Sequence, residues 1–272
     1  MKPAPFRYER PESLDEALAL LREHGDEAKV LAGGQSLVPL LNMRLARPSV
    51  LVDVNRVGGL DRIETNGSVR IGALVRQRDL ERAPLALVNE ALPHVGHFVT
   101  RNRGTVGGSI AHADAAAELP LCLAVLGGSV VARSAGGERE LAADDFFLGY
   151  FTTALAPDEL VVETRWPSLG AGWGFAFEEL AQRHGDYALS MAACALRVDG
   201  GRVAEARVGV GSVVDRPTLL DVEPGRDVSA AAKEAVGKLE LYGNLHASAA
   251  YQRHLTGVLV ERVLVRARRN AA

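Results

Sequence analysis

The sequence of 272 residues contains only two cysteines, Cys122 and Cys194, and both lie in apolar runs. Two thiols so far apart do not form a disulfide scaffold, and an iron–sulfur cluster would need about four cysteine ligands from the chain. We therefore expect two buried free thiols. The scarcity of cysteine excludes an iron–sulfur cluster that this chain alone could hold.

A charge imbalance and long apolar segments are also lacking. The net charge is −3, so the balance does not favour binding to nucleic acid or to an acidic membrane. No uncharged stretch reaches the roughly 20 residues that span a bilayer. The first five residues, Met1 to Pro5, lack the apolar core of a signal peptide. With 47% hydrophobic residues, we expect a globular cytoplasmic protein without a transmembrane segment or a nucleic-acid partner.

Helices and strands alternate over the first sixty residues. Ser13 and Glu16 have the spacing of a capping box, in which each side chain accepts from a backbone N–H at the start of a helix. Apolar residues then recur with helical spacing up to Gly25, so we expect the helix to end near His24. Short apolar runs predict the next elements, which are strands at 29–31 and 50–54 and a helix at 37–45. Residues 1–58 form a small α/β unit in this interpretation.

The rest of the chain divides near residue 170, because Pro167 to Gly172 combines proline and glycine without any periodicity. Before this linker we expect strands at 69–75, 129–132 and 159–164 and helical segments at 78–82 and 85–95. After it we expect an antiparallel sheet of three strands with a hairpin turn at Gly200-Gly201, and then two helices: strands 174–179, 188–198 and 203–210, and helices 230–241 and 249–269. The predicted domains are 1–58, 59–170 and 171–272.

Glycine is abundant, with 28 residues against 5% aromatics, and two of its pairs mark loops of interest. In the first loop a strand leads to Gly33 and Gly34, and a helix begins directly afterwards, so backbone N–H groups can meet an anion. The loop is neither a G-x-G-x-x-G fingerprint nor a P-loop. Taken alone, it fits a phosphate cradle or a simple chain reversal.

The second loop surrounds Gly107 and Gly108. The hydroxyls of Thr105 and Ser109 flank this pair, so the loop offers side-chain and backbone donors together, which a diphosphate without a metal ion needs. Two such loops about seventy residues apart can hold one extended ligand from both sides. Glu118 lies downstream and can accept from ribose hydroxyls, or it can simply be an acidic residue at a helix N-terminus.

Five motifs occur between residues 30 and 251: Ala32-Gly33-Gly34-Gln35-Ser36, Asn102-Arg103-Gly104-Thr105-Val106-Gly107-Gly108, Ala111-His112-Ala113-Asp114 to Leu119-Pro120, Arg183-His184-Gly185-Asp186-Tyr187-Ala188 and His246-Ala247-Ser248-Ala249-Ala250-Tyr251. In these motifs and in their order the chain resembles the flavin-binding medium subunits of molybdenum hydroxylases. That family includes carbon monoxide dehydrogenase, xanthine dehydrogenase and nicotine dehydrogenase. Motifs spread this widely are more specific than either glycine loop alone.

The resemblance implies an α+β protein with an FAD-binding fold of the vanillyl-alcohol-oxidase (PCMH) type. Two subdomains, 1–58 and 59–170, hold FAD, and a C-terminal domain, 171–272, has a three-stranded antiparallel sheet and helices. By similarity Glu118 contacts ribose and Leu160 lies beside the flavin, whereas Glu179 stands where the family often has lysine. The residues implied to bind FAD are Lys29, Val30, Leu31, Ala32, Gly33, Gly34, Gln35, Ser36, Leu37, Asn102, Thr105, Val106, Gly107, Gly108, Ser109, Ala111, Asp114, Glu118 and Leu160.

The resemblance also implies partners. A large subunit with a molybdopterin-type molybdenum cofactor would oxidise the substrate, and a small subunit would carry two [2Fe–2S] clusters. The FAD of this chain would pass the electrons to an external acceptor, and the assembly would be a dimer of heterotrimers. Because a bound flavin performs the redox chemistry, we expect neither a catalytic residue nor a metal site in this chain. The absence of a cysteine-rich insertion argues against the 4-hydroxybenzoyl-CoA reductase branch.

Two other functions stay open from the sequence. A stand-alone FAD-dependent oxidoreductase would need an acid or base at the flavin, for which Tyr187 and His184 are the candidates. A non-redox nucleotide-binding or scaffold module would need neither. The seven histidines do not show the H-E-x-x-H spacing, and there is no Gly-x-Ser-x-Gly elbow, which argues against metalloprotease and hydrolase chemistry.

Overall fold

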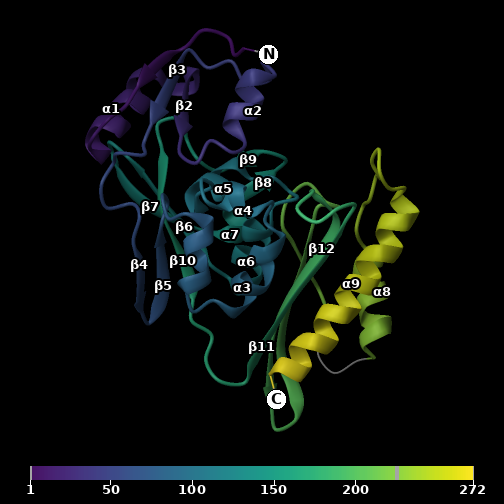
Figure 1. Ribbon diagram of the computed structural model, residues 1–272. Helices are drawn as coiled ribbons and strands as arrows, with labels where there is room; N and C mark the ends of the chain where they lie inside the picture. Colours follow the sequence, from purple (N-terminus) through teal and green to yellow (C-terminus); the bar gives the residue numbers. More distant parts are fainter. Residues whose placement is uncertain (1, 224–226, 272) are drawn as a thin grey trace.

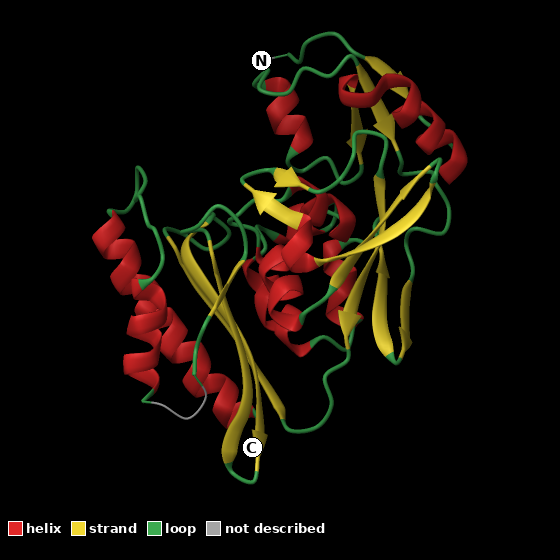
Figure 2. Ribbon diagram, turned by 180° about the vertical axis from the view of Figure 1, so that it is seen from behind, coloured by secondary structure: helices red, strands yellow, loops and turns green. Residues whose placement is uncertain are grey.

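The computed structural model describes residues 2–223 and 227–271. Within these residues, three larger β-sheets follow one another along the chain, and helices pack between and beside them (Figure 1). Figure 2 shows the same arrangement from behind, with a group of helices between the second and third sheets. Met1 and Ala272, the outer bounds of the predicted domain ranges, lie outside the described residues.

The first sheet is parallel and ends at the first glycine loop. Its strand order is β1 (Arg7–Glu9), β3 (Val50–Asp53) and β2 (Ala28–Leu31). Helix α1 (Leu14–His24) buries Leu18 and Leu21 against this sheet, as the helical spacing predicts. A short turn, η1 (Gly25–Glu27), connects α1 to β2, and α2 (Leu37–Asn42) follows the glycine loop. The predicted α/β alternation is confirmed.

The capping box of α1 forms with one difference. The N–H of Glu16 donates to the Ser13 hydroxyl at 3.2 Å, as predicted. The Glu16 carboxylate accepts from the N–H of Glu12 at 2.8 Å, one residue before the expected donor. At the start of α1, one orphan donor, the Glu16 N–H, is therefore satisfied by a side chain, and the Glu16 carboxylate binds the chain just before the N-cap.

The middle sheet is antiparallel, in the order β4-β5-β10-β6-β7. Its strands are β4 (Ile63–Asn66), β5 (Ser68–Gly72), β10 (Leu160–Pro167), β6 (Ser129–Ser134) and β7 (Gly137–Ala142). Short helices occupy the chain between β5 and β6: η2 (Gln77–Arg82), α3 (Ala86–Ala91), η3 (Leu92–His94), α4 (Phe98–Arg101), α5 (Val106–His112) and α6 (Glu118–Leu126). After β7 come α7 (Ala143–Phe146), β8 (Phe147–Gly149) and β9 (Thr152–Thr153), the last two forming a small sheet of their own.

Two expectations for this part of the chain need correction. The strand predicted at 69–75 ends at Gly72. Glycine is needed at this position, because a Cβ there would lie only 2.3 Å from the carbonyl oxygen of Leu60. The segment 78–82 belongs to a 3-10 turn, and 85–95 divides into α3 and η3. Pro93 lacks the N–H that a continuing α-helix would need at that point.

Helix α6 lies at the centre of the largest core cluster. All of its residues are buried, from Glu118 to Leu126, and it contacts β10, β12 and β13. The segment is apolar on every side, so helical periodicity gave no sign of it. The one charged residue of this helix is the first, Glu118, which is buried with the others.

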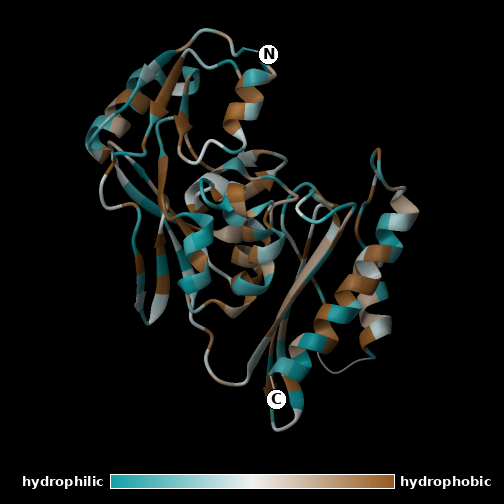
Figure 3. Cartoon of the chain, in the orientation of Figure 1, coloured by the Kyte–Doolittle hydropathy of each residue, from teal (hydrophilic) through white to brown (hydrophobic). Residues whose placement is uncertain are grey.

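The third sheet is antiparallel and has four strands, not the three predicted. They are β11 (Trp173–Ala181), β12 (Ala188–Asp199), β13 (Arg202–Gly211) and β14 (Thr218–Leu220). The missed strand, β14, has only three residues, too few for a pattern of alternation. Helices α8 (Val228–Gly237) and α9 (Ala249–Asn270) cover one face of the sheet, and α6 lies against the other (Figure 1). Hydrophilic and hydrophobic residues alternate along α9, as its amphipathic sequence predicts (Figure 3).

Both cysteines are buried and free, as predicted: Cys122 lies in α6 and Cys194 in β12. Burial raises the pKa of the Cys194 thiol to about 12, so it stays protonated. Among the residues that the structure describes, no helix combines the length and the apolar character that a membrane crossing requires.

Candidate dinucleotide-binding site

The two glycine loops meet through their backbones. A Cβ on Gly33 would lie 2.5 Å from the carbonyl oxygen of Arg103 and 2.9 Å from Cα of Gly104. A Cβ on Gly108 would lie 4.0 Å from Cβ of Ala32. Gly33 is therefore required for the close approach of the two loops, which lie about seventy residues apart in the sequence.

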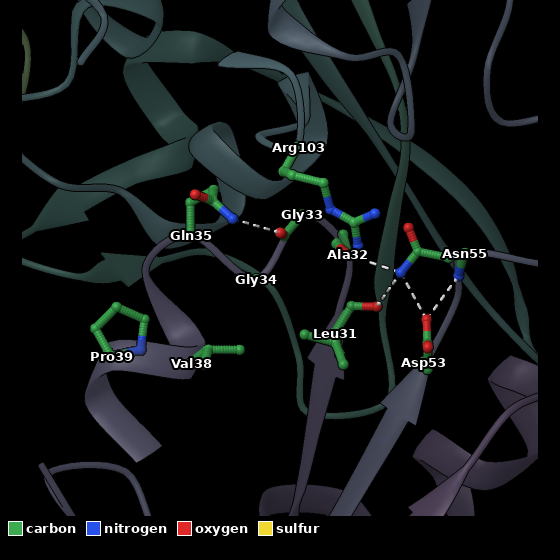
Figure 4. Close-up of a pocket in the computed structure, with 10 residues that line it drawn as sticks. All are labelled: Leu31, Ala32, Gly33, Gly34, Gln35, Val38, Pro39, Asp53, Asn55 and Arg103. Carbon is green, nitrogen blue, oxygen red and sulfur yellow. Dashed lines mark hydrogen bonds between the residues drawn. The ribbon is translucent and has the colours of Figure 1, made fainter. Parts of the chain in front are cut away.

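A cavity of about 410 Å³ opens beside this junction (Figure 4). The first loop and the start of α2 form one side, Arg103 extends over it from the second loop, and the ends of β2 and β3 form the floor and the other side. The lining residues are Leu31, Ala32, Gly33, Gly34, Gln35, Val38, Pro39, Asp53, Asn55 and Arg103. The cavity thus combines apolar walls with a few converging polar groups, as small-molecule sites do.

The first loop has free backbone donors. Within the described residues, the N–H groups of Gly33, Gly34, Gln35 and Ser36 donate to no protein acceptor. The Gln35 side chain donates to the Gly33 carbonyl oxygen at 3.2 Å and closes the turn from within (Figure 4). Gly34 has a φ of +73°, which a residue with a side chain adopts only under strain. Four unpaired N–H groups in succession make an anion-binding concavity.

The second loop is different, because the backbone donors of its glycine pair and of Ser109 are already engaged. Gly107 N–H donates to Ala73 O at 2.9 Å, Gly108 N–H to the Thr105 hydroxyl at 3.1 Å and Ser109 N–H to Thr105 O at 3.1 Å. The expectation of free backbone donors in this loop therefore needs correction. Thr105 caps α5 and pairs with Arg76 across a short β-bridge, and this bridge ties the loop to the end of β5. What the second loop can offer a ligand is the Ser109 hydroxyl and the guanidinium of Arg103.

The glycine pair of the second loop is explained by packing. A Cβ on Gly107 would lie 2.4 Å from Cβ of Ala73, and a Cβ on Gly108 would lie 2.6 Å from the Thr105 hydroxyl oxygen. Gly107 is therefore needed for α5 to lie against the end of β5. This role differs from that of Gly34, whose missing side chain leaves the turn conformation accessible.

Two arginines give the cavity a positive side. Arg76 donates to the Arg103 carbonyl oxygen at 2.6 Å and to Asn55 Oδ1 at 2.8 Å. Burial and then repulsion from Arg103 lower the pKa of Arg76 from its ordinary value. An anion placed between these guanidinium groups would relieve this repulsion.

Asp53 carries the negative charge on the opposite side, and protein donors already satisfy it. The Asn55 N–H and side-chain amide donate to Asp53 Oδ1 at 3.0 and 2.6 Å, and the Tyr8 hydroxyl donates to Oδ2 at 2.5 Å. Burial raises the pKa of Asp53, but these hydrogen bonds outweigh burial, and the pKa lies below its ordinary value. Asp53 therefore stays ionised and holds Asn55 at the cavity.

A second polar region lies beyond the far end of α5. This helix has seven residues, so about 10 Å separates its glycine end from the turn at Ala113. Asp114 follows this turn, and Glu118 then begins α6 in a buried position. Burial first, and then the nearby carboxyl of Glu179, raise the pKa of Glu118 to about 8.

The predicted site residues divide into those at the cavity and those around it. The cavity is lined by Leu31, Ala32, Gly33, Gly34 and Gln35. Flanking positions are taken by Lys29 and Val30 in β2, Ser36 and Leu37 at the start of α2, and Thr105, Val106, Gly107, Gly108 and Ser109 at the start of α5. Further along α5 and beyond it lie Ala111, Asp114 and Glu118.

Two predicted residues lie elsewhere. The Asn102 side chain accepts from Arg78 at 3.4 Å and lines a separate hollow with Phe98. Leu160 is 7% exposed and belongs to the core cluster that joins the first two sheets. Neither residue lines the cavity, so their roles at FAD stay predictions.

Asp53, Asn55 and Arg76 were not predicted. A usable signal existed for Asn55, because it follows a strand parallel to the one that carries the first glycine loop, and the carboxyl ends of parallel strands meet at one edge. No local pattern pointed to Arg76. Within the described residues, no group of three or more His, Cys, Asp or Glu side chains could hold a metal ion.

The fold is that of an α+β protein, and its cavity combines a glycine loop, backbone N–H groups that donate to no acceptor in the described residues and the guanidinium of Arg103, a set of donors that suits an anionic ligand. The chain belongs to the family described as "FAD binding domain in molybdopterin dehydrogenase", whose model matches residues 4–169. The FAD-binding fold and its C-terminal α+β domain are thereby confirmed.

Relatives extend over the whole chain. It is 43% identical to the alpha subunit of the 6-hydroxypseudooxynicotine dehydrogenase complex of Paenarthrobacter nicotinovorans, over 98% of this chain and 96% of that one. It is 40% identical to the nicotine 6-hydroxylase medium subunit of the same organism, over 98% and 99% of the two chains. A solved structure of carbon monoxide dehydrogenase from Hydrogenophaga pseudoflava superimposes with a TM-score of 0.95 at 36% identity, covering 100% of both chains.

Proposed function

We propose that this chain takes electrons from the [2Fe–2S] clusters of a small partner subunit and passes them through FAD to an external acceptor, within a molybdenum-containing dehydrogenase or hydroxylase. The observation that carries the proposal is the row of free N–H groups from Gly33 to Ser36, in a loop that lines the same cavity as Arg103. A diphosphate is the ligand that fits four adjacent N–H donors and a cation.

The residues present fit the rest of FAD as well. The diphosphate would lie at the first loop, and the Ser109 hydroxyl and Arg103 would complete its contacts from the second. The apolar walls of the cavity, which include Leu31 and Pro39, suit one of the two ring systems at the ends of FAD. The other end would extend along α5 towards Asp114 and Glu118, about one short helix away. Of the residues predicted to contact FAD, Leu31, Ala32, Gly33, Gly34 and Gln35 line the cavity, and the others do not.

When bound, FAD accepts and donates electrons singly or in pairs, and this is the chemistry that it supplies here. The chain's own residues bind and orient it. Val106 and Ile110 of α5 are buried in the core cluster and anchor the second glycine loop to it. Arg76 keeps the two loops in register by its bonds to Arg103 and Asn55.

The names of the relatives support a multi-subunit assembly. One is called subunit alpha of a complex, one a medium subunit, and a carbon monoxide dehydrogenase medium chain of Hydrogenophaga pseudoflava is 37% identical over 97% of both chains. By similarity we propose a large subunit with a molybdopterin-type molybdenum cofactor and a small subunit with two [2Fe–2S] clusters, in a dimer of heterotrimers. We also propose a cytoplasmic location.

The absorbance of the purified chain tests the FAD assignment. The full chain is freed of any flavin, titrated with FAD and followed by quenching of flavin fluorescence and by the flavin absorbance bands. Stoichiometric binding is expected, with little binding of FMN, because FMN lacks the diphosphate that the nest recognises. Absence of binding would overturn the proposal and leave a non-redox module.

Co-expression tests the subunit role. When it is produced together with the proposed large and small subunits, the chain is expected to co-purify with them, and its FAD to be reduced when the complex receives its substrate. Turnover of an organic substrate by the isolated FAD-loaded chain would instead identify a stand-alone oxidoreductase. Failure to co-purify would contradict the assembly without affecting FAD binding.

A further inference from the structure

Two of the free N–H groups in the first loop are oriented through the carbonyl oxygens of their own peptide units. These units are trans, so each carbonyl oxygen points away from the N–H that shares its plane. The Ala32 oxygen accepts from the Asn55 side chain at 2.8 Å, and the Gly33 oxygen accepts from the Gln35 side chain at 3.2 Å. These two bonds therefore fix the directions of the N–H groups that follow, those of Gly33 and Gly34.

The Asn55 side chain has no donor left for a ligand. It lies two residues after β3, and its nitrogen donates to the Asp53 carboxylate at 2.6 Å and to the carbonyl oxygens of Ala32 and Leu31, the latter at 3.4 Å (Figure 4). Its Oδ1 accepts from Arg76 at 2.8 Å. An amide nitrogen carries two hydrogens, and both are engaged with these acceptors. Asn55 therefore acts on a ligand through the loop and not by donating to it.

The side of Asn55 away from the loop is held by a further carboxylate and a tyrosine. One oxygen of Asp53 accepts from the N–H and the side chain of Asn55, and the other accepts from the Tyr8 hydroxyl at 2.5 Å. Tyr8 belongs to β1, which pairs with β3 on the side opposite β2. The carboxylate cannot rotate without breaking one of these bonds, so it presents a fixed acceptor to Asn55.

The same asparagine is joined to the second loop. Arg76 donates to Asn55 through Nη2 and to the carbonyl oxygen of Arg103 through Nη1 at 2.6 Å. Arg103 lines the cavity together with the first loop. The Asn55 amide and the Arg76 guanidinium therefore hold one carbonyl oxygen of each loop and are bonded to each other.

We propose that Asn55 is a positioning residue that presents the N–H groups of the first loop to the diphosphate of FAD, and that Tyr8 and Asp53 keep it in this orientation. The inference rests on the proposed function. Without the Asn55 amide, the Ala32 oxygen loses the donor that holds it, and the peptide unit that it shares with Gly33 can turn. The diphosphate must then order this unit when it binds, and the loss of conformational entropy weakens binding.

Titration of the full chain with FAD, followed by flavin fluorescence, is the first test. In Asn55→Ala we expect binding roughly 10- to 100-fold weaker than in the wild type. Tyr8→Phe removes only one hydroxyl and should weaken binding roughly two- to tenfold. Asn89→Ala is the matched control, because Asn89 of α3 also donates to a backbone carbonyl oxygen, that of Ala83 at 3.2 Å, but does not line the cavity. Wild-type affinity is expected there.

The amide resonances of the loop separate positioning from stability. In the ¹⁵N-labelled chain freed of flavin, inorganic pyrophosphate should shift the N–H signals of Gly33 and Gly34. These shifts should be smaller in Asn55→Ala and in Tyr8→Phe, at a temperature where circular dichroism shows both to be folded, and unchanged in Asn89→Ala. A merely structural role would lower the unfolding temperature and leave the shifts of the folded chain as they are.

Wild-type FAD affinity in Asn55→Ala and Tyr8→Phe would overturn the inference, and so would weaker binding with unchanged shifts. If Asn55→Ala does not fold, Tyr8→Phe decides: weaker binding with smaller shifts supports the inference, and wild-type values overturn it. Absence of FAD binding and of pyrophosphate shifts in the wild type would overturn the proposed function itself, and this result is recognised before any variant is compared.

Discussion

The substitution Gly33→Ala should separate the two glycine loops with one added carbon. The new Cβ would stand 2.5 Å from the Arg103 carbonyl oxygen, whereas unbonded carbon and oxygen need more than about 3 Å. The Arg103 carbonyl cannot retreat freely, because Arg76 donates to it at 2.6 Å and the N–H of Gln77 donates to the neighbouring Gly104 carbonyl at 2.9 Å. The loops must therefore move apart by roughly 0.5 Å or more.

Two consequences follow, and they can be measured separately. Overpacking of this kind costs about 1–3 kcal/mol of folding free energy, which thermal unfolding by circular dichroism detects. Loss of one charge-assisted hydrogen bond to the diphosphate, worth about 1.5–3 kcal/mol, should weaken FAD binding roughly 10- to 150-fold in a fluorescence titration. Gly58→Ala is the matched control, because a Cβ there has no atom within 4 Å. Wild-type affinity in Gly33→Ala, or an equal loss in Gly58→Ala, would refute the reasoning.

Three further predictions follow from single side chains. Glu118→Gln should stabilise the FAD-free chain above pH 5. Because the folded-state pKa of Glu118 is raised from 4.5 to about 8, the stability of the wild type declines as pH rises between these values, by at most about 5 kcal/mol. Urea denaturation of the variant at several pH values should lack this decline. Arg76→Met should weaken FAD binding about tenfold, because the Arg103 and Asn55 oxygens lose their donor; an unchanged affinity would contradict this. Trp166→Phe should cost about 2–4 kcal/mol in urea denaturation, because Trp166 is fully buried and donates to the buried Thr164 hydroxyl at 2.8 Å.

The parts of the fold that the sequence predicts are those with long patterns. The pair of strands around Gly200-Gly201 and the 22-residue helix α9 each repeat their period several times, and both are confirmed. Helix α6 could not be predicted, because it is buried on all sides and its sequence has no polar face. Strand β14 could not be predicted because three residues carry no period. Tertiary contacts, not local pattern, decide such elements.

The sequence predicts the site residues only where consecutive residues of one segment form the site. The turn at Gly33 and Gly34 is visible in sequence, because a strand, two glycines and a helix start follow one another. The contribution of Arg76 is not visible, since Arg76 acts through partners that the fold brings from elsewhere. For Asn55 the one signal is its place directly after a strand that runs parallel to β2. The sequence also does not show whether the N–H groups of the second loop are free. Those of Val106 and Gly107 are engaged, because the carbonyl oxygens of Val75 and Ala73, just after β5, accept from them.

The four glycines of the two loops therefore act in different ways on one ligand. Gly33 and Gly107 allow backbone to approach neighbouring residues, Gly34 permits a turn with positive φ, and Gly108 leaves room for the cap of α5. Within the described residues, the first loop offers a run of four backbone N–H groups without acceptors, and this loop can lie against the Arg103 backbone only because Gly33 has no side chain. Recognition of a diphosphate is thus a product of the packing between loops, and a substitution that spares every ligand contact can still abolish binding by moving one loop relative to the other.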